Sequence, residues 1–300
     1  DVTPKRTKKV NLTSNDQMSL FGGDDKPTES AVSLSSRNSI AHSDHFYQLV
    51  ETLGEARELA FLLAEKSSVA FDTETTSLEV LDAEVVGMSF SYAAGKAYYV
   101  NVPQERNEAK EWIHAFKPFW ESEETEKIGQ NIKYDISVLL NYDVQIKGPL
   151  FDTMIAHYLI QPDMRHNMDI LAETYLNYET ISIETRLGKK GKNQQNMRDL
   201  APEAVLNYAA EDADITFQLK GVFEPKLVET GVEKVFKNIE MPLVPVLARM
   251  EREGIKIDVH SLRSYSGELV ETIIRLEREI IELAGRPFNV GSPRQLGEVL

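Results

Sequence analysis

Two acidic side chains lie two residues apart at the end of an apolar run. Asp72 and Glu74 follow residues 69–71, Val-Ala-Phe, which have the composition of a buried strand. Because strand side chains alternate between faces, both carboxylates are expected to project from one face. Two such groups repel each other unless a divalent cation neutralises them. Taken alone, however, an Asp-x-Glu triplet is more typical of a strand that ends at the protein surface.

Two further motifs place polar side chains four residues apart. Asn131 and Asp135 form one pair, and Tyr208 and Asp212 form the other. Residues at this spacing lie on the same face of a helix. Each pair alone is better explained as a solvated helix face or, for Tyr208, as the margin of a core.

The three motifs together supply four carboxylates and a phenol, in the order strand, helix, helix. Hard oxygen ligands in this number suit Mg²⁺ or Mn²⁺. Two such ions about 3.5–4 Å apart can stabilise both the attacking and the leaving oxygen of a phosphodiester displacement. The combination therefore predicts a two-metal phosphodiesterase site.

The residues and the order of these motifs resemble those of the DEDD exonuclease superfamily in its tyrosine-containing branch, which has a ribonuclease H-like fold. The resemblance extends to the proofreading region of the bacterial DNA polymerase I family, from about residue 44 to the last residue. The matching segments are Phe71-Asp72-Thr73-Glu74-Thr75, Gly129-Gln130-Asn131-Ile132-Lys133-Tyr134-Asp135, Phe151-Asp152-Thr153-Met154, Tyr208-Ala209-Ala210-Glu211-Asp212-Ala213-Asp214 and Asn238-Ile239-Glu240-Met241-Pro242-Leu243-Val244-Pro245-Val246-Leu247.

This resemblance implies roles for five residues. Asp72, Glu74 and Asp212 would bind the tighter metal ion, and Asp72 would bridge to a second ion that Asp135 supports. Tyr208 and Glu74 would orient the attacking water. A free tyrosine has a pKa near 10, so we expect Tyr208 to position the water and the metal to activate it.

The resemblance also implies contacts with the substrate, a single-stranded or frayed 3′ end of DNA. Leu78 matches an aliphatic side chain that wedges against the terminal bases, although a core leucine at a strand end fits equally well. Gln130, Asn131 and Tyr134 match substrate-contacting positions. A basic segment, comprising Arg186, Lys189, Lys190, Lys192 and Arg198, is a candidate for phosphate contacts or a solvated loop.

The elements that position these residues follow from hydrophobic periodicity. Strands are expected at residues 46–50, 67–73, 85–92 and 97–102, and a short one near 127–129, with an antiparallel meander among them. Helices are expected at 55–66, 108–120 and 132–141, and helical patterns dominate from 152 to 222. The predicted fold is therefore α/β, a ribonuclease H-like mixed sheet flanked by helices. A strand at 254–258 and a long amphipathic helix are expected beyond it.

The composition of the chain excludes several classes of protein. The 300 residues carry a net charge of −15, contain no cysteine and include no apolar run long enough to span a membrane. Disulfide scaffolds and zinc–thiolate sites are excluded, and we expect a monomeric cytoplasmic protein that does not bind membranes. Acidity does not exclude a nucleic-acid enzyme, because metal-binding carboxylates are themselves negatively charged.

Three regions are expected along the chain: a flexible linker at 1–43, an exonuclease domain at 44–225, and the helical start of a truncated polymerase domain at 226–300. The predicted activity is proofreading hydrolysis of the 3′-terminal phosphodiester of DNA, which releases nucleoside 5′-monophosphates, with the rest of the polymerase in cis. One alternative is an RNA-trimming exonuclease related to ribonuclease D, which the polymerase-like residues 238–258 oppose. Another is a non-catalytic DNA-binding scaffold, which the complete set of carboxylates opposes.

Overall fold

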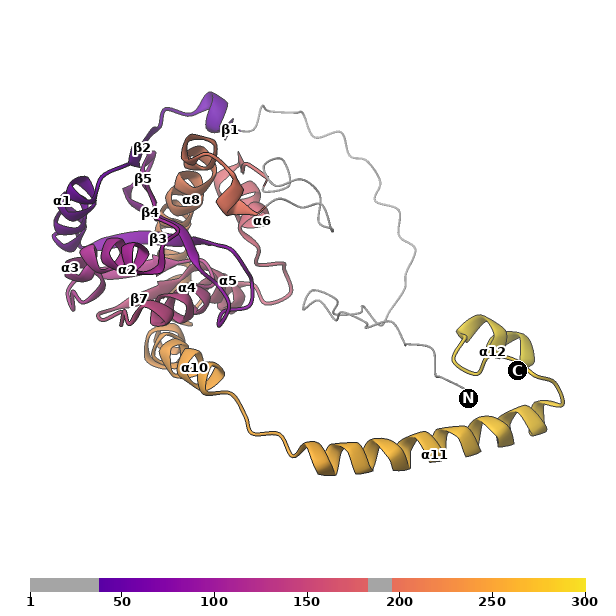
Figure 1. Cartoon of the computed structure of the whole chain (residues 1–300). Coiled ribbons are helices and arrows are strands. Elements are labelled where there is room, and N and C mark those ends of the chain that lie inside the picture. Colours follow the sequence, from indigo (N-terminus) through magenta and orange to yellow (C-terminus); the bar gives the residue numbers. More distant parts are fainter. Residues whose placement is uncertain (1–37, 183–195) are drawn as a thin grey trace. The chain divides into compact units, whose positions relative to one another are not determined.

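The computed structural model describes residues 38–182 and 196–300, and its centre is a mixed six-stranded sheet (Figure 1). The strand order is β2-β5-β4-β3-β6-β7; β3, β4 and β5 pair antiparallel, whereas β2, β6 and β7 join in parallel. The strands are β2 (Phe46–Val50), β3 (Ser68–Thr75), β4 (Val85–Ala93), β5 (Lys96–Asn101), β6 (Glu126–Gly129) and β7 (Leu150–Asp152), with β1 (Asn38–Ser39) and β8 (Tyr178–Glu179) as a separate pair. The predicted α/β fold is confirmed.

Helices flank this sheet and continue beyond it. They are α1 (Leu53–Ala64), α2 (Arg106–Ala115), α3 (Lys117–Trp120), α4 (Ile132–Leu139), α5 (Thr153–Ile160), α6 (Met168–Leu171), α8 (Pro202–Glu229), α9 (Glu233–Val235), α10 (Met241–Glu253), α11 (Val259–Ala284) and α12 (Pro293–Val299). Short helical turns are η1 (Ile40–His42), η2 (Leu140–Tyr142), η3 (Ala172–Leu176), η4 (Met197–Asp199) and η5 (Phe236–Glu240).

Two expectations about individual elements were wrong. The single helix at 108–120 is divided into α2 and α3, because Pro118 has no N–H to continue the first helix. The strand at 254–258 is absent, and those residues form no ladder with any described strand. Gly254 ends α10 with a positive φ of 69°, and the residues that follow it have no neighbouring strand to pair with.

The two faces of the sheet are covered by different helices. Phe71 of β3 pairs with Phe90 of β4, and both rings pack against Trp120 of α3, with centroids 5.1 and 5.6 Å away. Helix α8 contacts β3, β4 and β5, and its residues Val205 and Ala209 share a buried cluster with Tyr99 of β5. Odd-numbered residues of β3, such as Phe71, therefore face α3, and even-numbered residues face α8.

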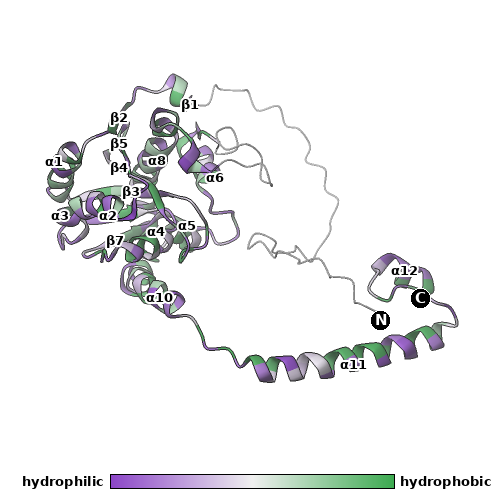
Figure 2. Cartoon of the chain, in the orientation of Figure 1, coloured by the Kyte–Doolittle hydropathy of each residue, from purple (hydrophilic) through white to green (hydrophobic). Residues whose placement is uncertain are grey.

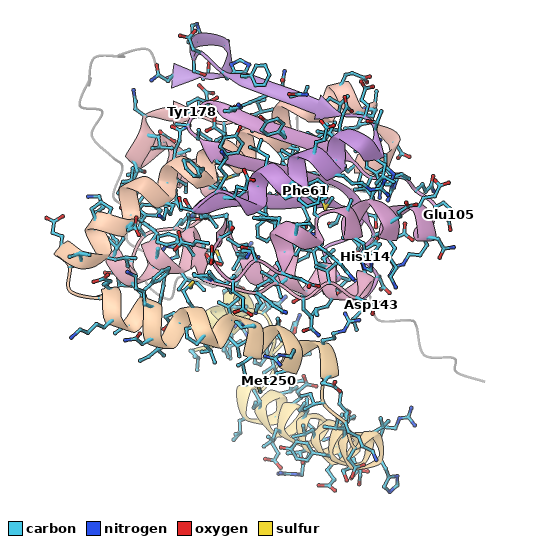
Figure 3. The ribbon with its side chains drawn as sticks, turned by 90° about the vertical axis from the view of Figure 1, so that its left-hand side faces the viewer. Phe61, Glu105, His114, Asp143, Tyr178 and Met250 are labelled. Atoms are coloured by element: carbon cyan, nitrogen blue, oxygen red, sulfur yellow. The ribbon has the colours of Figure 1, made fainter. Side chains whose placement is uncertain are left out.

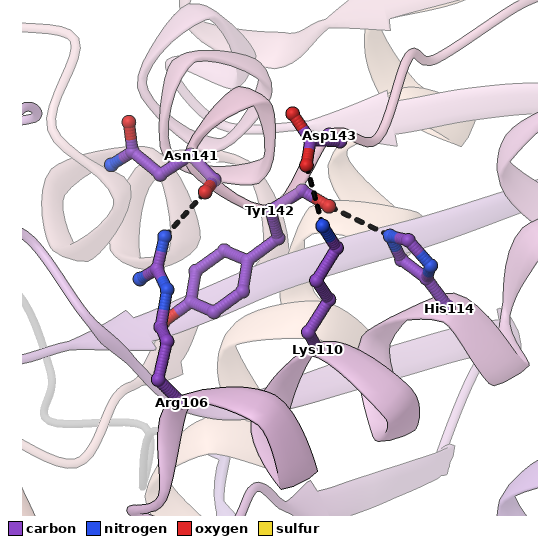
Figure 4. A network of polar contacts seen from close by, with 6 residues as sticks. All are labelled: Arg106, Lys110, His114, Asn141, Tyr142 and Asp143. Atoms are coloured by element: carbon purple, nitrogen blue, oxygen red, sulfur yellow. Dashed lines mark hydrogen bonds and ion pairs between the residues drawn. The ribbon is translucent and has the colours of Figure 1, made fainter.

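A polar ladder attaches α2 to the end of α4 (Figure 4). Three side chains of α2, one turn apart, reach three consecutive residues. The pairs are Arg106 with the backbone carbonyl of Asn141, Lys110 with the carboxylate of Asp143 (2.6 Å), and His114 with the backbone carbonyl of Tyr142 (2.7 Å). The Arg106 guanidinium also lies 4.0 Å from the centre of the Tyr142 ring. These contacts connect α2 to η2 and Asp143, which follow directly after α4.

Helix α10 packs against the same body, and Met250 marks its exposed last turn (Figure 3). Its apolar residues Met241, Val244 and Ala248 are buried, and Lys133 of α4 forms an ion pair with Glu251 (2.6 Å). No residue from 249 to 300 is buried.

The expected amphipathic helix is α11, along which hydrophobic and hydrophilic residues alternate (Figure 2). Its apolar residues, including Leu269 and Ile273, are 43% and 52% exposed. No helix in the described part of the chain is both long and apolar enough to cross a membrane. Residues 1–37 of the expected linker, and all of the basic segment except Arg198, lie outside the described residues.

Candidate metal centre and its surroundings

Three of the predicted carboxylates come together on the α8 side of the sheet. Asp72 and Glu74 project from the end of β3, and Asp212 comes from the middle of α8. One carboxylate oxygen from each lies within 4.8 Å of the other two. Glu74 and Asp212 are each 7% exposed, whereas Asp72 is only partly buried.

Asp135 approaches from the opposite layer of the fold. It lies in the first turn of α4 and is 2% exposed. Its Oδ1 accepts hydrogen bonds from the backbone N–H (3.0 Å) and from the hydroxyl (2.6 Å) of Thr73. Burial, followed by the charge of Asp72, raises the pKa of Asp135, so its carboxylate lies within electrostatic reach of the cluster.

Burial makes these acids hard to ionise together. It raises the pKa of Asp72 to about 6. The pKa values of Glu74, Asp135 and Asp212 are all raised well above the ordinary range, first by burial and then by the charge of Asp72. A divalent cation would remove this penalty because it favours the ionised carboxylates.

The donor set fits a hard divalent ion. All the converging ligand atoms are carboxylate oxygens, which Mg²⁺ and Mn²⁺ prefer over nitrogen or sulfur. The buried Glu74 Oε1 also has no hydrogen-bond partner among the described residues. A buried charged oxygen without a partner is costly unless a cation or water satisfies it. The residues present therefore fit a bound metal ion.

Tyr208 lies one turn before Asp212 on α8. Burial, followed by the negative charges of Asp212, Glu74 and Asp72, raises the pKa of its phenol far above the ordinary value. The raised pKa favours the neutral phenol, which can donate or accept a hydrogen bond at this site.

The neighbouring acids of α8 have different partners. Glu211 accepts hydrogen bonds from the Tyr178 hydroxyl (2.7 Å) and the Ile181 N–H (2.6 Å). Asp214 accepts from the Tyr47 hydroxyl (2.8 Å) and the Gly95 N–H (2.9 Å). Both are thus bound by protein groups outside the cluster, whereas Asp212 is the α8 acid that joins the cluster.

Tyr134 of α4 contacts the segment after β3 that carries Leu78. Leu78 is 83% exposed, a large apolar side chain close in sequence to the acidic cluster. The Tyr134 hydroxyl donates to the backbone carbonyl of Ser77 (2.6 Å) and shares a hydrogen bond with Thr75 (2.6 Å). Tyr134 therefore ties α4 to the segment that presents Leu78.

Gln130 and Asn131 lie between β6 and α4. The Gln130 amide donates to the backbone carbonyl of His166 (2.7 Å) and accepts from the Thr153 hydroxyl. Asn131 is exposed, with a left-handed φ of 61°, and its side chain makes no capping hydrogen bond to α4. Gln130 is thus held by protein groups, whereas the side chain of Asn131 faces solvent.

Arg198 does not offer its terminal nitrogens to phosphates. They donate to the backbone carbonyls of Val102 (3.0 Å) and Val85 (2.7 Å). The phosphate contact considered for the basic segment is therefore wrong for Arg198, which instead connects η4 to the ends of β4 and β5.

Two residues of the surroundings were not predicted. Asp152, which is 1% exposed, caps α5 and also accepts from the Ile132 N–H (2.8 Å) at the start of α4. An Asp directly before a helical pattern was the signal that could have revealed the first of these roles. Thr73 holds Asp135, but nothing in the sequence indicates that a threonine between two acids serves a third.

Sequence comparison gives an independent view of the chain. A family model described as 3′-5′ exonuclease matches residues 47–228. DNA polymerase I of Pseudomonas aeruginosa is 43% identical over 79% of this chain and 27% of that protein. DNA polymerase I of Borreliella burgdorferi is 35% identical over 95% of this chain and 31% of that protein. The chain thus spans less than a third of the length of these two relatives.

Solved structures share the fold at lower sequence identity. The polymerase domain of Pol1 from M. smegmatis, in complex with primer-template DNA and dNTP, superposes with a TM-score of 0.68 at 20% identity, covering 84% of this chain and 40% of that one. Brucella melitensis NrnC with bound Mg²⁺ gives 0.54 at 21% identity, covering 72% and 98%. Both support the ribonuclease H-like arrangement. Since the family model accounts for most of the folded body and two DNA polymerases I align with most of the sequence, the chain belongs to the 3′-5′ exonuclease domain family of DNA polymerase I.

Proposed function

We propose that this chain hydrolyses the 3′-terminal phosphodiester of single-stranded or frayed DNA and releases nucleoside 5′-monophosphates, using two Mg²⁺ or Mn²⁺ ions. The observation that carries the proposal is the meeting of Asp72, Glu74 and Asp212, with one carboxylate oxygen from each within 4.8 Å of the others. These acids come from a strand and a distant helix, and their burial is unfavourable without a cation. Brucella melitensis NrnC, a structural neighbour, was solved with Mg²⁺ bound.

The two ions would be bound by different sets of carboxylates. Asp72, Glu74 and Asp212 would hold one, and Asp72 together with Asp135 would hold the second. When bound, such ions supply Lewis-acid stabilisation of the phosphodiester and lower the pKa of water. The acidic side chains alone would repel a phosphate, so substrate binding is expected to depend on metal.

The remaining side chains orient the reactants. The neutral phenol of Tyr208, with the Glu74 carboxylate, would position the attacking water. Leu78, which is 83% exposed, would wedge against the terminal bases. Gln130, Asn131 and Tyr134 would line the path of the 3′ end; of these, Tyr134 would act through the segment that presents Leu78.

The relatives suggest the wider setting. They are DNA polymerases I, so we propose that residues 44–225 form the exonuclease domain, that residues 226–300 begin a polymerase domain in cis, and that residues 1–43 form a linker. The exposed apolar face of α11 is consistent with cover by the rest of that domain. We further propose a cytoplasmic monomer that acts in DNA replication and repair.

A direct assay tests the activity. The purified chain is incubated with a 3′-labelled DNA oligonucleotide in Mg²⁺, in Mn²⁺ or in EDTA, and released monophosphates are measured. We expect metal-dependent release from DNA, falling by about 10²–10³-fold in Asp72→Asn, the size of effect seen when one preorganised electrostatic group is removed. Glu111→Gln is the matched control, because Glu111 is an exposed acid on α2 that pairs with Arg57.

The other outcomes identify the alternatives. Release from RNA but not from the matched DNA would favour an RNA-trimming enzyme. Binding of the oligonucleotide without any release, in either metal, would favour a non-catalytic scaffold. Circular dichroism of each variant shows whether a loss of activity reflects a loss of fold.

A further inference from the structure

The predicted metal-binding acids lie on both sides of the sheet, and three of them, Asp72, Glu74 and Asp212, converge on the α8 side. Asp72 and Glu74 project toward α8, which contributes Asp212. Thr73, between them, projects toward the opposite layer, where α4 carries Asp135. A carboxylate from that layer must reach past the edge of β3 to serve the same site.

Thr73 makes this connection with two groups. Its backbone N–H and its hydroxyl both donate to Oδ1 of Asp135, at 3.0 and 2.6 Å. Thr73 is 6% exposed and Asp135 is 2% exposed, so water competes little for either bond. Hydrogen bonds from a hydroxyl to a carboxylate at this length are among the stronger ones in proteins.

These two hydrogen bonds restrict rotation of the Asp135 carboxylate. Two donors on one oxygen fix the carboxylate plane of Asp135, and a carboxylate has about four acceptor positions. The acceptor positions of Asp135 that Thr73 does not occupy then keep a constant direction. A metal ligand whose orientation is fixed by a hydrogen bond binds its ion more tightly than a freely rotating one.

We propose that Thr73 is a positioning residue of the exonuclease, whose hydroxyl sets Asp135 for the second metal ion. This inference rests on the proposed function. Thr73 itself contacts neither metal nor DNA in this proposal; it acts through Asp135. It also links the β3 motif directly to the α4 motif, since the residue between the two β3 carboxylates orients the carboxylate of α4.

The test compares Thr73→Val, which keeps the shape and the backbone N–H but lacks the hydroxyl, with Thr73→Ser, which keeps the hydroxyl. Thr125→Val is the matched control, because Thr125 is also fully buried and donates its hydroxyl to a protein oxygen, the backbone carbonyl of Ala64 (3.0 Å). Mn²⁺ binding is measured by calorimetric titration, and exonuclease kinetics are measured in parallel.

We expect Thr73→Val to weaken the second Mn²⁺ binding event by about 10–100-fold, the range found when such supporting partners of a metal ligand are removed. Its kcat at a subsaturating Mn²⁺ concentration should fall as well. Thr73→Ser and Thr125→Val should resemble the wild type in both measurements.

Wild-type Mn²⁺ binding and kcat in Thr73→Val would overturn the proposal, as would equal losses in Thr73→Val and Thr125→Val. If Thr73→Val does not fold, Thr73→Ala and Thr73→Ser are compared, because they differ by the hydroxyl alone, and equal Mn²⁺ affinity in that pair would overturn it. A wild-type chain without exonuclease activity would refute the proposed function instead, and the titration would still decide whether Thr73 supports metal binding.

Discussion

Replacing Asp152 should destabilise the fold by loosening two helices at once. The carboxylate is 1% exposed and accepts from three backbone N–H groups: Met154 (2.8 Å) and Ile155 (3.0 Å) on Oδ1, and Ile132 (2.8 Å) on Oδ2. Removing the cap of α5 costs about 1 kcal/mol. Leaving the buried N–H of Ile132 without a partner adds about 1–3 kcal/mol. Asp152→Ala should therefore lower the free energy of unfolding by about 2–4 kcal/mol.

Urea unfolding followed by circular dichroism measures this loss. Asp152→Asn should lie between the wild type and Asp152→Ala, because its amide oxygen can still accept while its NH₂ cannot. Asn131→Gly is the control at the same helix start: Asn131 makes no side-chain cap and has a φ of 61° that glycine adopts readily. A loss below about 0.5 kcal/mol in Asp152→Ala, within the range of ordinary surface substitutions, would refute the reasoning, as would an equal loss in Asn131→Gly.

Three further substitutions have defined outcomes. Gly87→Ala should cost about 1–3 kcal/mol in urea unfolding, because its Cβ would lie 2.3 Å from the Tyr99 hydroxyl; an unchanged midpoint would contradict this. Asp212→Asn should raise the thermal unfolding temperature in EDTA at pH 8, because the raised folded-state pKa of Asp212 means that its ionisation costs stability as pH rises above about 4. The same variant should lose activity when metal is supplied. The gain in unfolding temperature should shrink toward pH 4, and calorimetry that shows a lower unfolding temperature at pH 8 would contradict the reasoning. Tyr134→Phe should raise KM for DNA in the exonuclease assay, because the segment that presents Leu78 loses an anchor; an unchanged KM would contradict this.

Local sequence patterns predicted the strands β2 to β6 of the central sheet but not β7, which is three residues long. Phe71 and the two residues before it are fully buried, as a central strand covered on both faces requires. The run at 254–258 alternates apolar and polar residues, as a half-buried strand would, but strand formation needs a neighbour to pair with, and five residues alone do not indicate one. Pairing is a tertiary property, and this explains why that expectation was wrong.

Part of the acidic cluster could be predicted from sequence, because local periodicity determines which side chains share a face. Alternation along β3 places Asp72 and Glu74 on one face, and the helix spacing brings Tyr208 alongside Asp212. The support that Thr73 gives to Asp135 spans 62 residues of sequence. Such a contact depends on how two layers pack, so spacing alone could not predict it.

Crystals of the protein soaked in Mn²⁺ and a nucleoside 5′-monophosphate, with anomalous diffraction recorded near the manganese edge, would locate the ions. Two anomalous peaks about 3.5–4 Å apart are expected, one among Asp72, Glu74 and Asp212 and the other between Asp72 and Asp135. Well-diffracting crystals in saturating Mn²⁺ with no peak within coordination distance of Asp72 would contradict the account of these carboxylates as a metal centre.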